Sequence, residues 1–191
     1  MQLILDNIAA IMIGSAVILI VLSTQFQAQR AATEQTIALI SKTATLDLGR
    51  VLEEDLIVLG SGTSDTITDI QESGDSLTTV FEFRKLDELG TEIEVTYRLT
   101  DANVVTIRGE AVQLYTLDRY EDDVWAGGGG DHIRFFSISM LNTNGHKTSG
   151  VASARLLRVR LVNVYPYGED DGSTIFQSHW GITVRPEGLA P

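Results

Sequence analysis

Two acidic stretches carry the side chains of this chain that are best suited to binding a metal ion. Their seven carboxylates belong to Glu121, Asp122, Asp123, Asp131, Glu169, Asp170 and Asp171. Carboxylate oxygens are the ligands that Ca²⁺ prefers, although neither stretch has EF-hand spacing. The candidate calcium ligands are therefore Asp122 and Asp123 in the expected loop 118–131, and Asp170 and Asp171 in the expected loop 168–173. The alternative is a solvated acidic surface.

The chain offers little for zinc or nucleophilic chemistry. Its three histidines, His132, His146 and His179, have neither HExxH nor paired spacing. There is no cysteine and no GxSxG motif. The four glycines at 127–130 are not followed by the Lys-Ser/Thr of a phosphate loop, so they predict a mobile loop or a close backbone approach. We expect no enzymatic activity and no cofactor other than the candidate calcium.

Charge bears on the partners of this protein. The formal net charge is −12, which argues against nucleic-acid binding because phosphate recognition needs clustered Lys and Arg. The densest basic cluster is Arg155, Arg158 and Arg160. Since side chains alternate along a strand, Arg158 and Arg160 share a face. We interpret this face as ion-paired with nearby acids rather than as a ligand site.

The first 22 residues are nearly all apolar, with Asp6 as their one charge. A helix of this length spans roughly 30 Å, about one membrane hydrocarbon core. Three interpretations compete: a cleaved signal peptide, a plain membrane anchor, and the N-terminus of a processed subunit. An acid at the start of such a segment usually has a partner. We expect Asp6 to meet a free N-terminal amine, that of Met1 or of a neighbouring subunit; the alternative is the lipid headgroup region.

The elements that follow predict an α+β fold. Residues 23–59 keep a helical period, and the stripe expected to pack is Phe26, Thr33, Ile37, Ile40, Ala44, Leu48 and Val51. We expect Gly49 to weaken this helix. We also expect the helix to fray near Glu53 and to stop at Gly60. The period then changes to two, which predicts an antiparallel β-sheet. The predicted domains are therefore a membrane or filament-core helix at 1–22, an amphipathic stalk at 23–59 and a β-rich head at 63–191.

The strands are expected at 77–83, 92–99, 104–108, 110–117, 133–141, 154–165 and 174–184. Asp101-Ala102-Asn103 reads as a turn between two of them. Residues 142–150 read as a polar loop.

This order of elements resembles the type IV pilin-like superfamily, which includes pilins, minor pilins and type II secretion pseudopilins. The resemblance rests on the apolar start with one early acid, the continuous helix and the β head. The segments that look most similar are LDLGRVLEEDLIVLGSG (46–62), EIEVTYRLTDANVVTIRGE (92–110) and FQSHWGITVRPEGL (176–189). The family's early acid is usually glutamate one place nearer the N-terminus, its first residue is usually phenylalanine, and a proline usually follows the membrane half.

The resemblance implies a life cycle and a set of partners. A leader peptidase removes a basic leader, the new N-terminus is methylated, and subunits wait in the inner membrane for the pilus assembly machinery. They then form a homo-oligomeric helical filament outside the cell, in which the early acid, here Asp6, pairs with the amine of the adjoining subunit. Gly14 and Ser15 are small residues that would let helices approach closely. The alternatives are a minor tip or priming pseudopilin, and a single-span anchored β-domain that binds a ligand.

Overall fold

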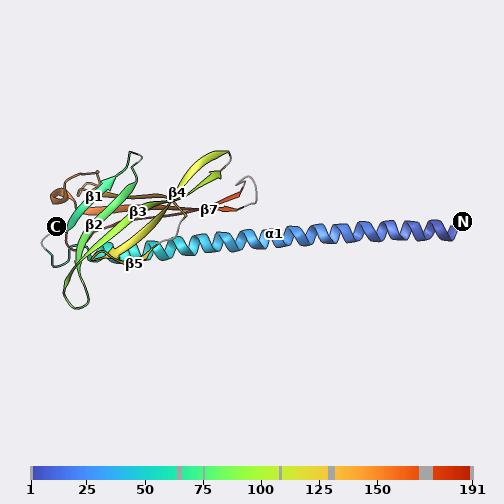
Figure 1. The fold of residues 1–191 in the computed structure, drawn as a ribbon, viewed down its shortest axis with the longest axis horizontal. Coiled ribbons are helices and arrows are strands. Elements are labelled where there is room, and N and C mark those ends of the chain that lie inside the picture. The colour runs from blue at the N-terminus through green and yellow to red at the C-terminus, as the bar shows by residue number, and fades with distance from the viewer. Residues whose placement is uncertain are drawn as a thin grey trace. The chain divides into compact units, whose positions relative to one another are not determined.

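The protein is an α+β chain in which one long helix precedes an antiparallel sheet (Figure 1). The structure is a computed structural model that describes residues 2–63, 66–74, 76–107, 109–128, 132–167 and 174–189, without the side chains of 2–6, 167 and 174. The chain divides into two compact units, Met1–Leu39 and Ile40–Pro191. The predicted fold class is confirmed.

Helix α1 covers Gln2–Val58 and continues through the positions where weakness was expected. The predicted stop is confirmed: Gly60 has a φ of 70°, and the N–H of Ser61 donates to the carbonyl of Val58 at 3.0 Å. The predicted fraying near Glu53 is wrong. Leu52 and Leu56 are fully buried on either side of it, and this packing offsets the poor placement of acids at a helix C-terminus.

In the part of the chain that the structure describes, eight strands follow the helix, and all of their pairings are antiparallel. They are β1 (Ile67–Glu72), β2 (Thr78–Leu86), β3 (Glu92–Ile107), β4 (Glu110–Glu121), β5 (Val124–Gly128), β6 (Ile133–Leu141), β7 (Leu156–Tyr167) and β8 (Thr174–Val184). The sheet order is β1-β2-β3-β4-β6-β7-β8, and β5 pairs with β4 alone. A short 3₁₀ helix, η1 (Val151–Ser153), precedes β7. The predicted bounds of β6 and β8 are confirmed.

Two predicted breaks in the sheet are wrong. The expected turn at Asp101–Asn103 lies inside β3, where the strand takes a bulge against β4 and continues. The expected loop 118–131 contains the end of β4 and all of β5. The turn between these two strands places Asp122 and Asp123 at positive φ, which aspartate tolerates better than most residues. Strand β1 was not predicted.

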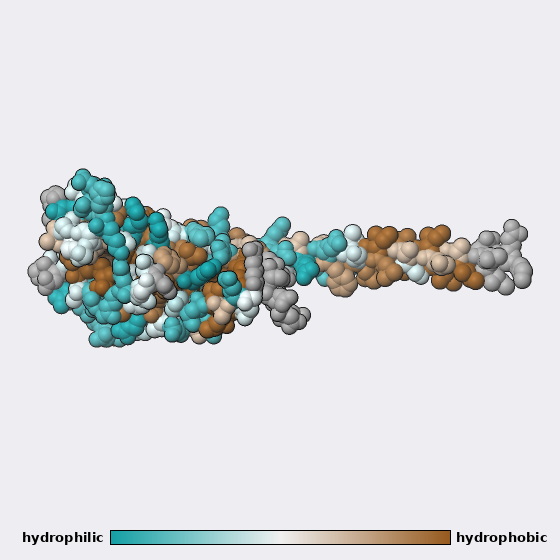
Figure 2. Space-filling view, turned by 90° about the horizontal axis from the view of Figure 1, so that it is seen from above, coloured by the Kyte–Doolittle hydropathy of each residue, from teal (hydrophilic) through white to brown (hydrophobic). Residues whose placement is uncertain are grey.

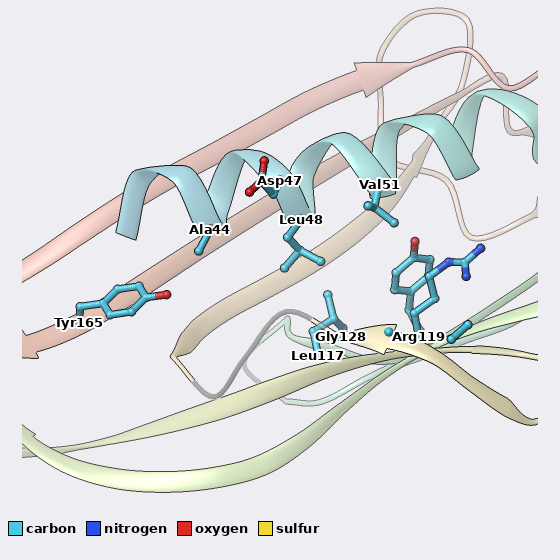
Figure 3. A pocket seen from close by; sticks show the side chains of 11 residues that line it. Ala44, Asp47, Leu48, Val51, Leu117, Arg119, Gly128 and Tyr165 are labelled. Atoms are coloured by element: carbon cyan, nitrogen blue, oxygen red, sulfur yellow. The ribbon is translucent and has the colours of Figure 1, made fainter. Parts of the chain in front are cut away.

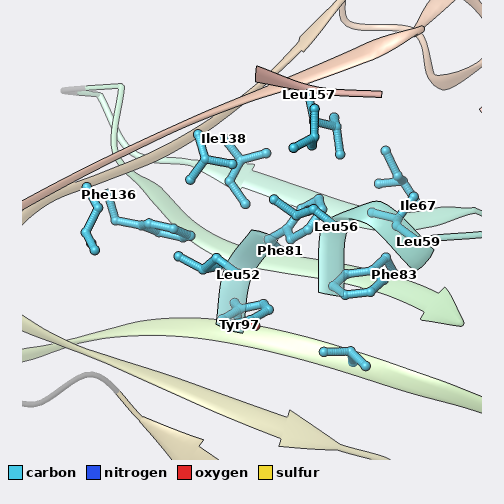
Figure 4. Close-up of a cluster of buried hydrophobic side chains, with 14 of the residues drawn as sticks. Leu52, Leu56, Leu59, Ile67, Phe81, Phe83, Tyr97, Phe136, Ile138 and Leu157 are labelled. Atoms are coloured by element: carbon cyan, nitrogen blue, oxygen red, sulfur yellow. The ribbon is translucent and has the colours of Figure 1, made fainter. Parts of the chain in front are cut away.

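The core of the second unit lies between the last turns of α1 and one face of the sheet (Figure 4). Leu52 and Leu56 from the helix meet aromatic and aliphatic residues that alternate along the strands. The fully buried strand residues with the largest side chains include Phe81, Phe83, Tyr97, Phe136, Ile138 and Leu157. Stacking extends the cluster sideways, with the Phe83 and Tyr97 ring centroids 6.4 Å apart.

Within the second unit, the predicted packing stripe of the helix is confirmed at Leu48 and is wrong at Ile40 and Val51. The buried residues of α1 from position 41 onward are Ser41, Thr45, Leu48, Gly49, Leu52, Asp55 and Leu56. Only Leu48 belongs to both sets. Polar residues occupy inward positions here, and a stripe chosen by hydrophobicity passes over them. The more apolar Ile40 and Val51 are left partly exposed at 54% and 42%.

Candidate functional site

The apolar segment of α1 is a surface with no partner inside its own unit. Every described side chain from Asn7 to Gln29 is exposed, and Ile13, for example, is 67% exposed. Figure 2 shows the hydrophobic side chains gathered along this part of the helix. The helix is long and apolar enough to cross a membrane, by length and composition, and none of its most apolar window is buried. A signal sequence near an N-terminus meets the same criteria.

The polar groups within this segment are satisfied by the helix itself. The Ser15 hydroxyl donates to the carbonyl of Ile11 at 2.7 Å, and the Thr24 hydroxyl donates to the carbonyl of Ile20 at 2.8 Å. Such bonds remove the cost of placing a hydroxyl in an apolar environment. A β-carbon on Gly14 would meet nothing within 4 Å, so the helix surface at Gly14 and Ser15 is low and open. Met1 and the side chain of Asp6 lie outside the described residues.

The acidic turn at the end of β4 has a structural role. The Asp122 carboxylate accepts the N–H of Glu94 at 2.9 Å, and the N–H of Asp122 donates back to the carbonyl of Glu94 at 2.9 Å. Asp122 therefore fastens the β4–β5 turn to β3. Within the described part of the chain, no three or more His, Asp or Glu side chains group to hold a metal. Asp170 and Asp171 lie outside the described residues, as do Asp131 and Glu169, so calcium binding stays a prediction.

The histidines occupy separate settings. The His132 ring meets Tyr165 edge-on with centroids 4.3 Å apart. The backbone N–H of His146 donates to the side chain of Asn142 at 3.0 Å in the predicted polar loop. His179 is exposed on β8.

The ion-paired interpretation of the arginine cluster is wrong. Arg158 and Arg160 are exposed on β7, and neither makes an ion pair or hydrogen bond with the described residues. Arg155 instead donates to the carbonyls of Ala152 and Ala154 at 3.0 and 2.7 Å. The prediction failed because the acids that are close to these arginines in the sequence do not lie across from β7 in the sheet.

Sequence reasoning also missed the main buried polar cluster, which centres on Asp55 of α1. Asp55 is 5% exposed and accepts hydrogen bonds from three strands. The donors are Lys85 Nζ at 2.7 Å, Arg119 Nε at 2.6 Å and Tyr97 OH at 2.6 Å. Arg119 also bonds Glu121 at 2.6 Å. The available signal was the position of Asp55, three residues after Leu52 and four before Leu59, on the helix face that packs.

The charges of this cluster support one another. Burial raises the pKa of Asp55, but the hydrogen bonds from Arg119, Lys85 and Tyr97 outweigh it and leave the pKa below its usual value. Burial and the neighbouring Asp55 charge raise the pKa of Tyr97 well above its usual value. Asp55 is therefore ionised and Tyr97 protonated at neutral pH. The cluster locks α1 to β2, β3 and β4.

A groove of about 500 Å³ lies between α1 and the β4–β5 hairpin (Figure 3). Its walls are mostly apolar, from Ala44, Leu48 and Val51 on the helix to Leu117 on β4. The β5 wall contains part of the glycine run, and a β-carbon on Gly128 would lie 2.8 Å from the Asp118 carboxylate. The predicted close backbone approach is therefore confirmed at this glycine.

No protein-family model, curated protein or solved structure matches this chain. The long apolar N-terminal helix followed by an antiparallel sheet fits a pilin-like fold, and this agreement concerns architecture alone.

Proposed function

We propose that this protein is a structural subunit of an extracellular pilus-like filament, assembled by packing its N-terminal apolar helix against the same helix of other copies. The observation that carries the proposal is the run of exposed apolar side chains on α1 from Ile8 to Leu22. Water does not tolerate a surface of this size for a lone soluble chain. A membrane covers it before assembly, and neighbouring helices cover it afterwards.

The composition of the segment suits both environments. Lipid tails give a helix little apolar reason to associate, so close packing must drive assembly. The small residues that allow close approach are Ala9, Ala10, Gly14, Ser15 and Ala16. Because the Ser15 hydroxyl is already bonded to the Ile11 carbonyl, it can move from lipid to a helix bundle without an unsatisfied donor.

The continuity of α1 favours a filament over a plain anchor. A tethered head calls for a flexible junction near residues 23–30, but α1 passes through them as helix. In the second unit, the Asp55 cluster and the leucines around it fix the end of α1 to the sheet. A filament subunit needs its sheet fixed firmly to the end of its helix, and this junction provides that.

The groove beside α1 favours the second candidate, an anchored domain that binds a ligand. At about 500 Å³ and with mostly apolar walls, it has the size of a small-molecule site. The groove is also bounded by α1, and a filament contact through α1 would cover it. The same groove therefore fits an assembly contact equally well.

The test is electron microscopy of filaments sheared from the source cells, with mass spectrometry of their N-terminal peptide. We expect filaments that contain this chain with a processed, methylated N-terminus. Recovery of the chain in membranes alone, with no filament, would overturn the main-subunit proposal. A processed N-terminus there would support the minor pseudopilin, and an unprocessed one the anchored domain.

A further inference from the structure

The sheet carries opposite charges on two parts of the face that points away from α1. On β7, Leu157, Val159 and Leu161 are fully buried against the core. Because side chains alternate along a strand, the intervening Arg158 and Arg160 point to the outer face.

No acid lies across the sheet from these arginines. Arg158 is paired in register with Ser139 of β6 and Thr183 of β8. Arg160 is paired with Ser137 and Gly181. Beside them lies a hollow of about 430 Å³, lined by residues that include Phe135 and His179. We call Arg158, Arg160 and this hollow the basic patch.

The other part of the outer face is acidic. Glu82 lies on β2 between the buried Phe81 and Phe83, so it too points away from the core. Asp69 of β1 is its register partner, and Glu94 lies on the neighbouring strand β3. We call Asp69, Glu82 and Glu94 the acidic patch.

The acidic patch has an excess of negative charge. The pKa of Glu82 is raised, first by burial and then by Glu94 and Asp69, although Arg98 partly lowers it. Arg84 pairs with Glu94 only at 3.7 Å. Carboxylates that repel one another in the free chain gain from an added cation.

No ion pair joins the two patches within the described part of one chain. Arg158 and Arg160 have no acidic partner there, and Glu82 lies beside two other carboxylates. Each patch therefore has charge to offer to another molecule, and the complementary surface is present on every copy.

We propose that the basic patch of one copy binds the acidic patch of a second copy of this chain. The contact joins different surfaces of the two molecules, so it is directional and repeats without closing into a dimer. It rests on the proposed function in one respect: in a filament, it would set the lateral order of the heads around the packed helices.

The test uses the absence of native cysteine. Thr183→Cys places a thiol beside Arg158, and Gln71→Cys places one beside Asp69; both positions are exposed. Purified full-length chains in mild detergent are oxidised singly and as a mixture, and separated without reductant. We expect disulfide dimers in the mixture, and a ladder from the chain that carries both cysteines. Equal dimers from each chain alone, or no excess in the mixture, would overturn the proposal.

Charge reversal separates a specific contact from random collision. Arg160→Glu in the Thr183→Cys chain should lower crosslinking at least about tenfold, because like charges then face each other. Glu82→Lys in the Gln71→Cys partner should restore it. The matched control is Lys42→Glu, which changes an exposed, unpaired cation on α1 and should have no effect. Equal losses from Arg160→Glu and Lys42→Glu would also overturn the proposal.

The two proposals fail separately. Native filaments formed by a chain whose patches do not crosslink would refute the contact and leave the filament. Specific crosslinking of a chain that never appears in filaments would support the contact and refute the filament.

Discussion

A β-carbon on Gly49 would lie 2.5 Å from Cε2 of the Trp180 indole, so α1 packs against β8 through a position that has no side chain. The residue that looked like a weak point of the helix is therefore a packing site. The indole occupies the space that the β-carbon of any other residue at position 49 would need.

We expect Gly49→Ala to destabilise the second unit by about 1–3 kcal/mol. Alanine gains up to about 1 kcal/mol of helix propensity, but a clash with a ring held by its neighbours outweighs that gain. Urea unfolding followed by tryptophan fluorescence measures the change. Gly74→Ala is the control, since its β-carbon would meet nothing within 4 Å and should leave the midpoint unchanged.

We expect Asp55→Asn to lower the free energy of unfolding by about 3 kcal/mol, because it leaves the buried Lys85 and Arg119 without their main counter-charge. Asp47→Asn is the matched control: this helix aspartate is exposed, makes no ion pair, and should change stability by less than about 0.5 kcal/mol. Equal effects of the two substitutions would show that the Asp55 cluster does not hold the helix to the sheet.

The Asp55 cluster also predicts a pH dependence. The pKa of Asp55 is lower in the folded chain than its usual 3.8, so its stabilisation is complete above that value and is lost as the pH falls through the folded pKa. The stability difference between wild type and Asp55→Asn should therefore shrink below about pH 4. Unfolding curves between pH 2 and pH 7 test this, and a constant difference would contradict it.

A second polar link joins the helix to β7. The buried Asn163 Nδ2 donates to Thr45 Oγ1 at 2.8 Å, while Asn163 Oδ1 has no hydrogen-bond partner among the described residues. Thr45→Val should cost about 1–3 kcal/mol by leaving the amide donor unsatisfied in the core. The control is Thr43→Val at an exposed position of the same helix. Thermal unfolding of both variants would separate the lost bond from the helix propensity of valine.

The exposed apolar surface predicts a sensitive position far from the core. Ile13→Lys should reduce membrane retention and filament yield, since a charge near the centre of a membrane helix costs about 2.5–3.5 kcal/mol. Gln27→Lys adds the same charge beyond the apolar run and should be tolerated. Cell fractionation and counts of sheared filaments provide the measurement. Normal assembly of the Ile13→Lys variant would show that this surface is not the packing surface.

The sequence by itself determined the fold class and most of the elements, although it left β1 and β5 unpredicted and divided β3 in two. The apolar run, the helical period and the change to alternation at residue 63 are local patterns, and they set the fold class, the stop at Gly60 and the bounds of β6 and β8.

The tertiary structure decided which helix face is buried and which charges meet. A stripe chosen by hydrophobicity placed Ile40 and Val51 on the buried face, whereas the sheet covers Thr45 and Asp55. Polar side chains can be buried in a core when strands distant in sequence supply their hydrogen-bond partners. Partners 30 to 64 residues from Asp55 leave no local pattern. The unpaired state of Arg158 and Arg160 likewise depends on strand order, since only register shows that serine, threonine and glycine face them.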